Sequence, residues 1–577
     1  MRKWLSKLVA GVLACSSMLS IVACGGGGDK DFSDFLQSVG GSEGGSTNVT
    51  EKVIDPTKTQ LSVKNYTAGF GDEWLYDLET RFEEAYKDVS YEDGKKGVQV
   101  WHSGDMKTYT AQDVIAGDTD IYFMEGASYY ALTKTEGALE NLTDIVTQPN
   151  PDDNNKTILS KLTQQQKSFF GRTGTDGDPK YYAIPHYEGG WGMIYNKELF
   201  DAKGYYMADV PVGEAYRLIE EGDTKGKGPD GVAGTSDDGL PRTYDEFFFL
   251  CDEIAVRGDI PICWSGQYRE HYLNHFMNTL VAEYCGIKQM ELNLTFEGEA
   301  EDLVVFDENG AIVYENGEIK TEKMTITHEN GYDVSRQAGK LYALEFLHKL
   351  MTTDGYCYTK NAFNSTHSHT AAQENFLKGG TKISSDKAYA MLIDGPWWEA
   401  EATSVFTLMG LQDSQYSKKN RDFAWMPLPK ATEAKVGTKN IYIDTLSALT
   451  CVKSGLGPRK QAAIDFVKFS ATDESLVKFT QITGALKSYN YTLTAEEKSV
   501  LSPFAQSVIN YKENADSFVM DSGNDFFVSN ASTFKLINYY AAKGFSNPVA
   551  AFNENAMEGE EYFESMVSHW KGTSIWG

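Results

Sequence analysis

The stretch KYYAIPHYEGGWGMIYNKELF, residues 180–200, is the part of the sequence on which the expected fold depends. It predicts one long extended segment with a Gly-Gly pair near its middle. Around it, strand patterns alternate with helix patterns: QLSVKNYTA (60–68) alternates apolar and polar residues, and EWLYDLETRFEEAYKDV (73–89) has apolar residues at helical spacing. Strands interleaved with helices indicate an α/β fold with a largely parallel sheet.

The composition excludes one class of partner and favours another. The 577 residues carry a formal net charge of −29 and have an isoelectric point near 4.8. Because binding to nucleic acid phosphates needs a basic surface, we do not expect a nucleic acid partner. The chain contains 33 Tyr and 10 Trp, so some of these amphipathic rings should lie at surfaces or in clefts where they can meet a ligand.

The N-terminus predicts export. Arg2, Lys3 and Lys7 precede the apolar stretch LVAGVLACSSMLSIVA (8–23), which is too short for a typical membrane span. The end of this stretch, SIVAC, resembles the lipobox of bacterial lipoproteins, which implies cleavage after residue 23 and a lipid on Cys24. A Gly- and Ser-rich stretch follows and predicts a flexible linker. The alternative is an ordinary secretory signal with a chance Cys.

Several further segments, in this order, resemble the extracellular solute-binding proteins of bacterial ATP-binding-cassette carbohydrate importers, of the maltose-binding-protein type. Together they span about residues 60 to 490. The segments are GFGDEW (69–74), YYAIPHYEGGWGMIYNKELF (181–200), TYDEFFFLCDEI (243–254), AYAMLIDGPWWEAEA (388–402), FAWMPLPKA (423–431) and YIDTLSALTCVKSGLGPRKQAAIDFVKFSATDES (442–475).

The resemblance implies two α/β lobes joined by a hinge of crossing strands, with the ligand held in a cleft between them. It implies a monomer on the extracellular or periplasmic side of the membrane that delivers an oligosaccharide to permease subunits, without being an enzyme. The expected segments are a signal peptide at 1–23, lipidated Cys24 and linker at 24–58, the first part of lobe one at 59–185, lobe two at 186–395 with insertions at about 205–242 and 286–332, a return segment mostly in lobe one at 396–490, and a C-terminal helical part packing on the lobes at 491–577.

The chemistry of sugars suggests which residues form the site. A sugar presents apolar C–H faces that match aromatic planes, and hydroxyls that match carboxylates and amides through paired, charge-assisted hydrogen bonds. We therefore expect Trp and Tyr beside Asp and Glu at loops near strand ends. The candidates are Asp394, Trp397, Trp398, Glu188, Trp191, Trp264, Tyr268, Asp72, Trp74, Glu125 and Asp444.

The adjacent pair Trp397 and Trp398 is the strongest candidate. By the resemblance, Trp397, which follows Gly-Pro, aligns with the sugar-stacking Trp of the family. Neighbouring residues point apart on a helix or strand, so we expect one ring to face the sugar and the other to pack into the lobe. Trp397 is the first choice for the sugar-facing ring and Trp398 the second. The structural alternative is that one ring is core and the nearby acids mark a helix N-terminus.

A second candidate site is the loop GDTKGKGPDGVAGTSDDGLP, residues 222–241, whose acids are Asp223, Asp230, Asp237 and Asp238. Ca²⁺ takes six to eight oxygen ligands from flexible loops, so a structural Ca²⁺ is one interpretation. The EF-hand spacing is absent, and the other interpretation is a solvated, turn-rich insertion. We expect no other cofactor.

Two further hypotheses stay open from the sequence alone. A surface glycosidase or lyase would also pair carboxylates with aromatic rings. A binding protein for a non-sugar solute such as a peptide is the other. His271 and His275 are four residues apart in a predicted helix, so they could hold a metal or lie on a helix face near the cleft.

Overall fold

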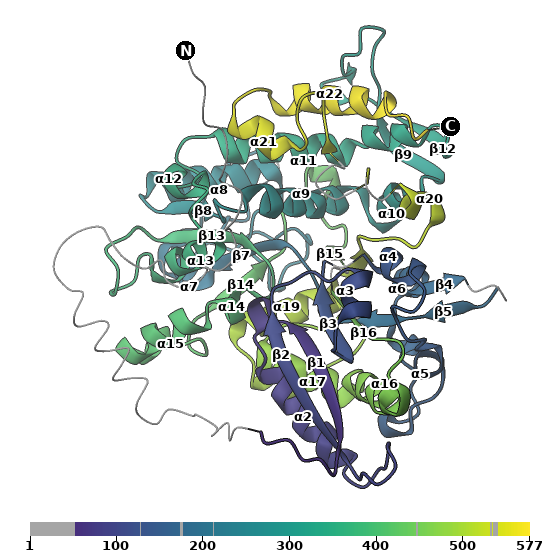
Figure 1. Ribbon diagram of the computed structural model, residues 1–577. Helices are drawn as coiled ribbons and strands as arrows, with labels where there is room; N and C mark the ends of the chain where they lie inside the picture. Colours follow the sequence, from purple (N-terminus) through teal and green to yellow (C-terminus); the bar gives the residue numbers. More distant parts are fainter. Residues whose placement is uncertain are drawn as a thin grey trace, which may run out of the picture. The chain divides into compact units, whose positions relative to one another are not determined.

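Two separate β-sheets organise residues 56–577, which form one compact unit (Figure 1). The structure is a computed structural model, and it describes residues 52–577 except 127, 174–176, 212, 446–447, 531–532, 535–539 and 577. The predicted signal peptide, Cys24 and most of the linker lie outside the described residues.

The first sheet has the strand order β2-β1-β3-β16-β6. β1 pairs in parallel with both β2 and β3, whereas β16 runs antiparallel to β3 and β6. Alternate residues of β1 are buried, including Leu61 and Val63, as the sequence alternation predicts. The strands are β1 (Thr59–Tyr66), β2 (Val98–Asp105), β3 (Ile121–Glu125), β6 (Ala183–Pro185) and β16 (Ala448–Val452).

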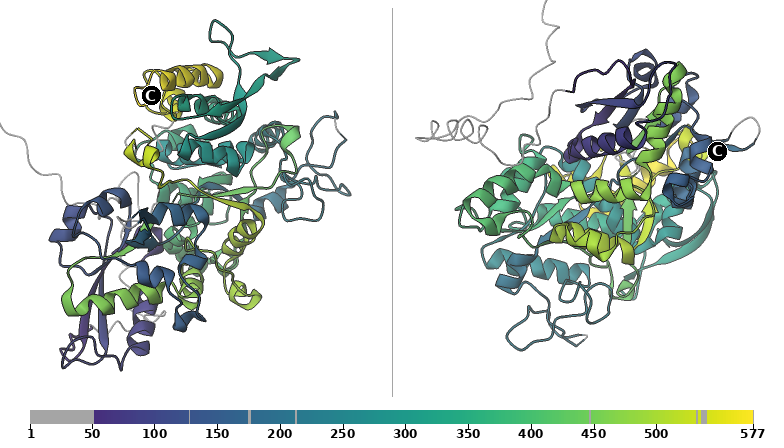
Figure 2. Two further views of the ribbon diagram at one scale, coloured as in Figure 1. Left: turned by 90° about the vertical axis from the view of Figure 1, so that its right-hand side faces the viewer. Right: turned by 90° about the horizontal axis from the view of Figure 1, so that it is seen from below.

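Helices from both ends of the sequence cover this sheet. α2 (Glu73–Ala85) buries Leu75, Leu78 and Phe82, a spacing of three and four residues that places them on one helix face. It packs against α16 (Lys460–Ser470) and α17 (Asp473–Thr483), and Figure 2 shows the purple α2 beside these green helices. The first sheet therefore depends on residues nearly 400 positions apart.

The second sheet has the order β14-β7-β13-β8. Only β13 and β8 are parallel, and β13 is buried along its whole length. Thr243, a residue type that favours helix starts, caps α8, because its side chain accepts the N–H of Glu246. The elements are β7 (Gly192–Asn196), β8 (Ile260–Cys263), β13 (Tyr389–Asp394), β14 (Phe423–Met426), α8 (Tyr244–Val256), α9 (Arg269–Cys285), α11 (Ala338–Thr352) and α13 (His369–Lys378).

The stretch 180–200 is not one strand, so that prediction was wrong. β6 ends at Pro185 in the first sheet, β7 begins at Gly192 in the second, and the residues between them cross from one sheet to the other. The last residues of the stretch belong to a helix, α7 (Lys197–Lys203). The Asn196 side chain accepts the N–H of Leu199 and caps this helix, which ends the extended conformation.

The chain crosses back through β15 (Ile441–Asp444), which pairs in parallel with β17 (Asp516–Val519) and leads to β16 in the first sheet. Near the C-terminus, α21 (Pro548–Asn553) and α22 (Gly559–Lys571) pack on α11 (Figure 1). Another helix, α19 (Pro503–Asn514), packs against β14.

Residues 286–332 include a helix and two strand pairs. α10 (Ile287–Thr295) is followed by β9 (Gly298–Val304), which pairs antiparallel with β12 (Thr321–Ile326). The Asn316–Gly317 pair, a typical hairpin sequence, joins β10 (Tyr314–Glu315) to β11 (Glu318–Ile319), and both turn residues have positive φ.

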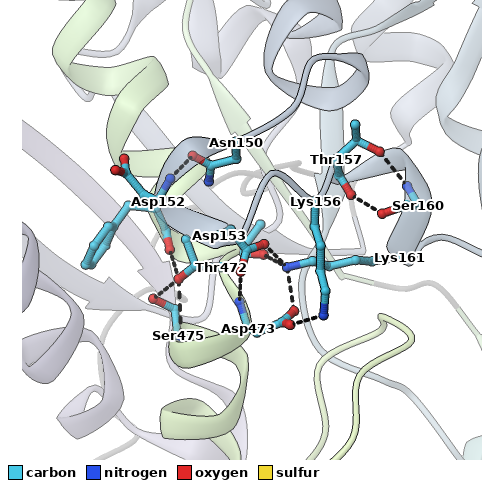
Figure 3. A network of polar contacts seen from close by, with 12 residues as sticks. Asn150, Asp152, Asp153, Lys156, Thr157, Ser160, Lys161, Thr472, Asp473 and Ser475 are labelled. Carbon is cyan, nitrogen blue, oxygen red and sulfur yellow. Dashed lines mark hydrogen bonds and ion pairs between the residues drawn. The ribbon is translucent and has the colours of Figure 1, made fainter.

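A buried ion-pair network fixes the loop before α6 (Gln164–Phe170) to the start of α17 (Figure 3). The ammonium of Lys161 pairs with Asp153 and lies 2.7 Å from Asp473, and it also donates to the carbonyl of Ala471. Lys161 and Asp153 are both almost fully buried, whereas Lys156, which also pairs with Asp473, is half exposed.

We expect Lys161→Ala to lower the free energy of unfolding by about 3–5 kcal/mol, because it leaves a buried carboxylate without its counter-charge. The matched control is Lys156→Ala, whose exposed ion pair should contribute less than about 1 kcal/mol. Urea denaturation followed by circular dichroism measures both. Equal effects of the two substitutions would contradict the assignment.

Candidate functional site

A cavity of about 620 Å³ lies where elements of the two sheets meet the crossing segments. The first-sheet side contributes the carboxyl ends of β1 and β3, and the second-sheet side contributes α9, α13 and the loop after β13. The lining residues are Tyr66, Gly69, Phe70, Met106, Glu125, Tyr187, Gly189, Trp191, Tyr268, His271, Tyr272, His275, His369, Trp397, Glu401 and Thr445.

Trp397 and Trp191 form the aromatic centre of the cavity. Their ring centroids are 4.8 Å apart and the rings are nearly perpendicular. Trp191 also stacks on His275 at 5.0 Å and meets Tyr272 edge-on at 4.6 Å. The Trp397 ring folds back onto Gly395, where an added Cβ would lie 2.2 Å from the ring. Only a glycine at 395 therefore allows this position of the indole.

Trp398 lies in the hydrophobic core and not in the cavity. It begins the short helix α14 (Trp398–Glu401) and is completely buried. Its ring packs edge-on against Phe376, Phe423 and Phe504. The adjacent tryptophans thus have different surroundings, with Trp397 at the cavity and Trp398 beneath it.

Three carboxyl groups gather at one end of the cavity. Burial, reinforced by the charge of Glu401, raises the pKa of Glu125 to about 7. Burial also raises the pKa of Glu401 to about 7. Behind Glu401, the fully buried Asp394 has a pKa well above its ordinary value, first because of burial and then because of Glu401. The amide of Gln373 joins the last two, donating to Asp394 at 3.0 Å and to Glu401 at 2.6 Å.

Two predicted residues support the crossing segments next to the cavity rather than lining it. Glu188 is buried and forms an ion pair with Lys512. Asp444 accepts the N–H of Gly189 at 3.1 Å and the hydroxyl of Ser488. Their carboxylates are therefore engaged with other parts of the chain.

Three other predicted residues lie away from the cavity lining. Trp264 is buried, and its indole N–H donates to the carbonyl of Ala362 at 3.0 Å. Trp74 is buried between Phe123 and Phe479. Asp72 precedes α2, and its carboxylate lies 3.4 Å from the His102 ring. Of the predicted set, the structure brings Trp397, Trp191, Glu125 and Tyr268 to the cavity and places Asp394 directly behind it.

Sequence reasoning missed several lining residues. Tyr66 is one of them. It ends β1 as the predicted Glu125 ends β3, and the carboxyl ends of parallel strands are common ligand sites, so its position was a signal that the sequence offered. Glu401 was noted only as one of the acids beside the tryptophan pair, and Tyr187, Tyr272 and His369 carried no comparable signal. Burial lowers the pKa of His271 and of His275, so both imidazoles are neutral at pH 7.

The aspartates of the 222–241 loop do not converge on one point. Asp223 pairs with Arg217, Asp237 accepts from Asp230 N–H and from the Thr235 hydroxyl, and Asp238 accepts from Gly234 N–H. Among the described residues, no group of three or more His, Cys, Asp or Glu is arranged to hold a metal ion. The structural Ca²⁺ stays a prediction.

A second cavity of about 750 Å³ borders this loop, β14 and α19. Its lining includes Asp230 and Asp237, together with Trp425 and Asn510. It contains none of the predicted saccharide-binding residues, so the cavity around Trp397 is the better candidate site.

Comparison with known proteins agrees with this assignment. Residues 65–284 match a family model described as bacterial extracellular solute-binding protein. One similar solved structure comes from work on xylan utilisation by the thermophilic bacterium Caldanaerobius polysaccharolyticus, with a TM-score of 0.52 and 15% identity over 88% of this chain and 99% of that one. Another is a chitin oligosaccharide binding protein, with a TM-score of 0.50 and 16% identity over 89% and 98%. No curated protein sequence matches the chain.

These findings bear on the sequence predictions. The expected α/β fold of two-lobed solute-binding proteins is confirmed by these structural similarities. The matched family consists of binding proteins, which agrees with the prediction that the chain is not an enzyme. In the part of the chain that the structure describes, no helix combines the length and the apolar character needed to cross a membrane.

The different surroundings of the two tryptophans predict different effects on stability. We expect Trp398→Ala to lower the free energy of unfolding by about 3–5 kcal/mol, because it empties a fully packed site. Trp397→Ala removes a ring that borders a cavity and should lower it by about 1 kcal/mol, the average for point mutants. Chemical denaturation measures both values, and a larger loss for Trp397→Ala would contradict the placement.

Proposed function

We propose that the chain is a bacterial extracellular solute-binding protein that captures an oligosaccharide in the cavity around Trp397 and delivers it to a membrane permease of the ATP-binding-cassette type. The single observation that carries the proposal is the composition of the cavity wall. Aromatic rings, led by Trp397 and Trp191, lie beside the carboxyls of Glu125 and Glu401. This pairing matches the apolar faces and the hydroxyls of sugar rings.

The descriptions of the similar structures support a saccharide ligand. One is named a chitin oligosaccharide binding protein, and the other comes from a study of xylan utilisation. The cavity volume of about 620 Å³ lies within the usual range for small-molecule sites.

Ligand capture would be coupled to a hinge motion. The cavity wall comes from both sheets, while Gly189 and Thr445 on the crossing segments also border it. A ligand that contacts both sides at once stabilises the arrangement in which they are close, so binding shifts the population toward that arrangement. A permease could then distinguish the loaded protein from the empty one by this geometry.

The stacking role of Trp397 is testable by calorimetry with a glycan panel that includes chitin, xylan and maltose oligosaccharides. We expect Trp397→Ala to weaken binding of the best glycan by about 2 kcal/mol, as for a buried aromatic contact. Trp397→Phe is the matched control and should recover part of the affinity. Full affinity of Trp397→Ala would refute the stacking role. Release of shorter products during the titration would instead favour the glycosidase or lyase hypothesis. Binding of peptides but of no glycan would favour a binding protein for a non-sugar solute.

We also propose that Cys24 carries a lipid that anchors the protein on the outer face of the membrane. The support is sequence alone: a charged start, a short apolar stretch and SIVAC. Cys24→Ser should release the protein into the medium, because the substitution removes the side chain that would carry the lipid. Cys15→Ser is the matched control inside the same leader and should leave the protein in the membrane fraction. Immunoblots of cell fractions measure both, and retention of Cys24→Ser in the membrane would refute the anchor.

A further inference from the structure

The lining of the cavity around Trp397 carries acidic side chains but no Lys or Arg among the described residues. Its acids are Glu125 and Glu401. The basic residues that directly follow the lining residues Met106 and Tyr268 in the sequence contact other groups. Lys107 pairs with Asp113 at 2.6 Å, and Arg269 donates to the carbonyl of Gly266 at 2.8 Å.

The histidines of the cavity do not supply a positive charge at neutral pH. Burial lowers the pKa of His271, His275 and His369. The ring of His369 lies 3.8 Å from the carboxylate of Glu401. The amide of Gln373, which bridges Glu401 to Asp394, carries no charge. Two carboxyls therefore line the cavity, with Asp394 behind them, and no basic side chain of the described lining supplies a counter-charge.

The rest of the wall suits a cation. Trp397, Trp191, Tyr66, Tyr272 and Phe70 line the cavity with aromatic rings, whose faces attract positive charge. Tyr187 adds an independent observation. Its ring lines the cavity and is 3% exposed, yet in the described part of the chain its hydroxyl has no hydrogen-bond partner.

We infer that the saccharide taken by this cavity carries an amine, with the protonated amino group held at Glu125 and Glu401 and against the aromatic wall. The inference rests on the proposed function and narrows its ligand class to amino sugars with a free amino group. A neutral sugar could also donate hydroxyl hydrogens to these carboxyl groups, but it would offer no counter-charge to their ionised forms in a partly desolvated site. An ammonium supplies the missing charge, and the net charge of −29 on the whole chain attracts such a ligand.

The affinity of these carboxyl groups for an ammonium should depend on pH. The pKa of Glu125 and that of Glu401 are both about 7 in the empty cavity, so each is partly protonated at pH 7. An ammonium favours the ionised carboxylates, lowers their pKa and so releases protons on binding. Affinity for the amine should therefore rise as pH increases from 5.5, and fall again where the ammonium of the amino sugar, itself a weak acid near neutral pH, loses its proton. The other titratable groups of the described lining are Tyr66, Tyr187, Tyr268, Tyr272 and the three histidines, with Asp394 behind Glu401.

Isothermal titration calorimetry on the mature chain tests the inference with a matched ligand pair: a β-1,4-linked glucosamine tetramer and the same tetramer fully N-acetylated. Cellotetraose and xylotetraose are neutral references. At pH 7 we expect the amine to bind at least about tenfold more tightly than its acetylated counterpart, the effect of a charge-assisted hydrogen bond. Titrations at pH 6, where the amine is charged, in two buffers of different ionisation enthalpy should show net proton release for the amine only. The preference should shrink at pH 5.5.

Glu401→Gln and Glu125→Gln should each remove most of this preference, because they keep the shape and remove a charge. Glu73→Gln, on the exposed start of α2, is the charge-matched control and should retain it. Thermal unfolding checks that each variant is folded, and the ligand pair on the unaltered chain decides the question if one is not. Equal or tighter binding of acetylated or neutral tetramers would overturn the inference while leaving the proposed function intact. Failure of every saccharide to bind would overturn both.

Discussion

The passage of the chain between the two sheets depends on the hydrogen bonds of one buried carboxylate, Asp444. It accepts the N–H of Gly189 and the hydroxyl of Ser488, so it joins three segments that are far apart in the sequence. A buried carboxylate without such partners would be strongly destabilising. The outward crossing after Pro185 and the return crossing through β15 are therefore held at one fixed point.

The other end of β15 is fixed in the same way, by a buried ion pair. Glu283 on α9 receives the ammonium of Lys430 and the N–H of Ile441, and Tyr511 donates its hydroxyl to the same carboxylate. The return strand thus starts from an anchor on the second-sheet side and ends at an anchor on the first crossing segment. Gly189 and Thr445, at that second anchor, are cavity residues. The position of the site follows from where the chain must cross.

Much of this arrangement is predictable from local patterns, and the exceptions have a common cause. Alternating strand and helix periods predict the α/β class, Thr243 predicts a helix start, and Asn316–Gly317 predicts a hairpin, because each depends on near neighbours. The stretch 180–200 is different. Its residues are suited to extended structure, but which sheet each half joins is decided by β16 and by β13 and β14, more than 190 residues away.

The residues of the site likewise fall into those that nearby sequence predicts and those whose position depends on distant partners. Trp397 was predicted from the resemblance of its Gly-Pro-Trp segment to the family, and Glu125 from its place at a strand end, so both predictions used short stretches of sequence. Trp264 and Trp74 have similar local patterns, yet distant partners bury them: Ala362 accepts the indole N–H of Trp264, and Phe479 packs on Trp74. Glu401 was missed for the converse reason. A Cβ added to Gly69 would lie 2.2 Å from the Glu401 side chain, so a glycine in the first-sheet loop makes room for a carboxylate from α14. An acid near a helix start is ordinarily explained by the helix dipole, and only the absence of a side chain more than 300 residues earlier allows this one to approach Glu125 and form the acidic end of the cavity.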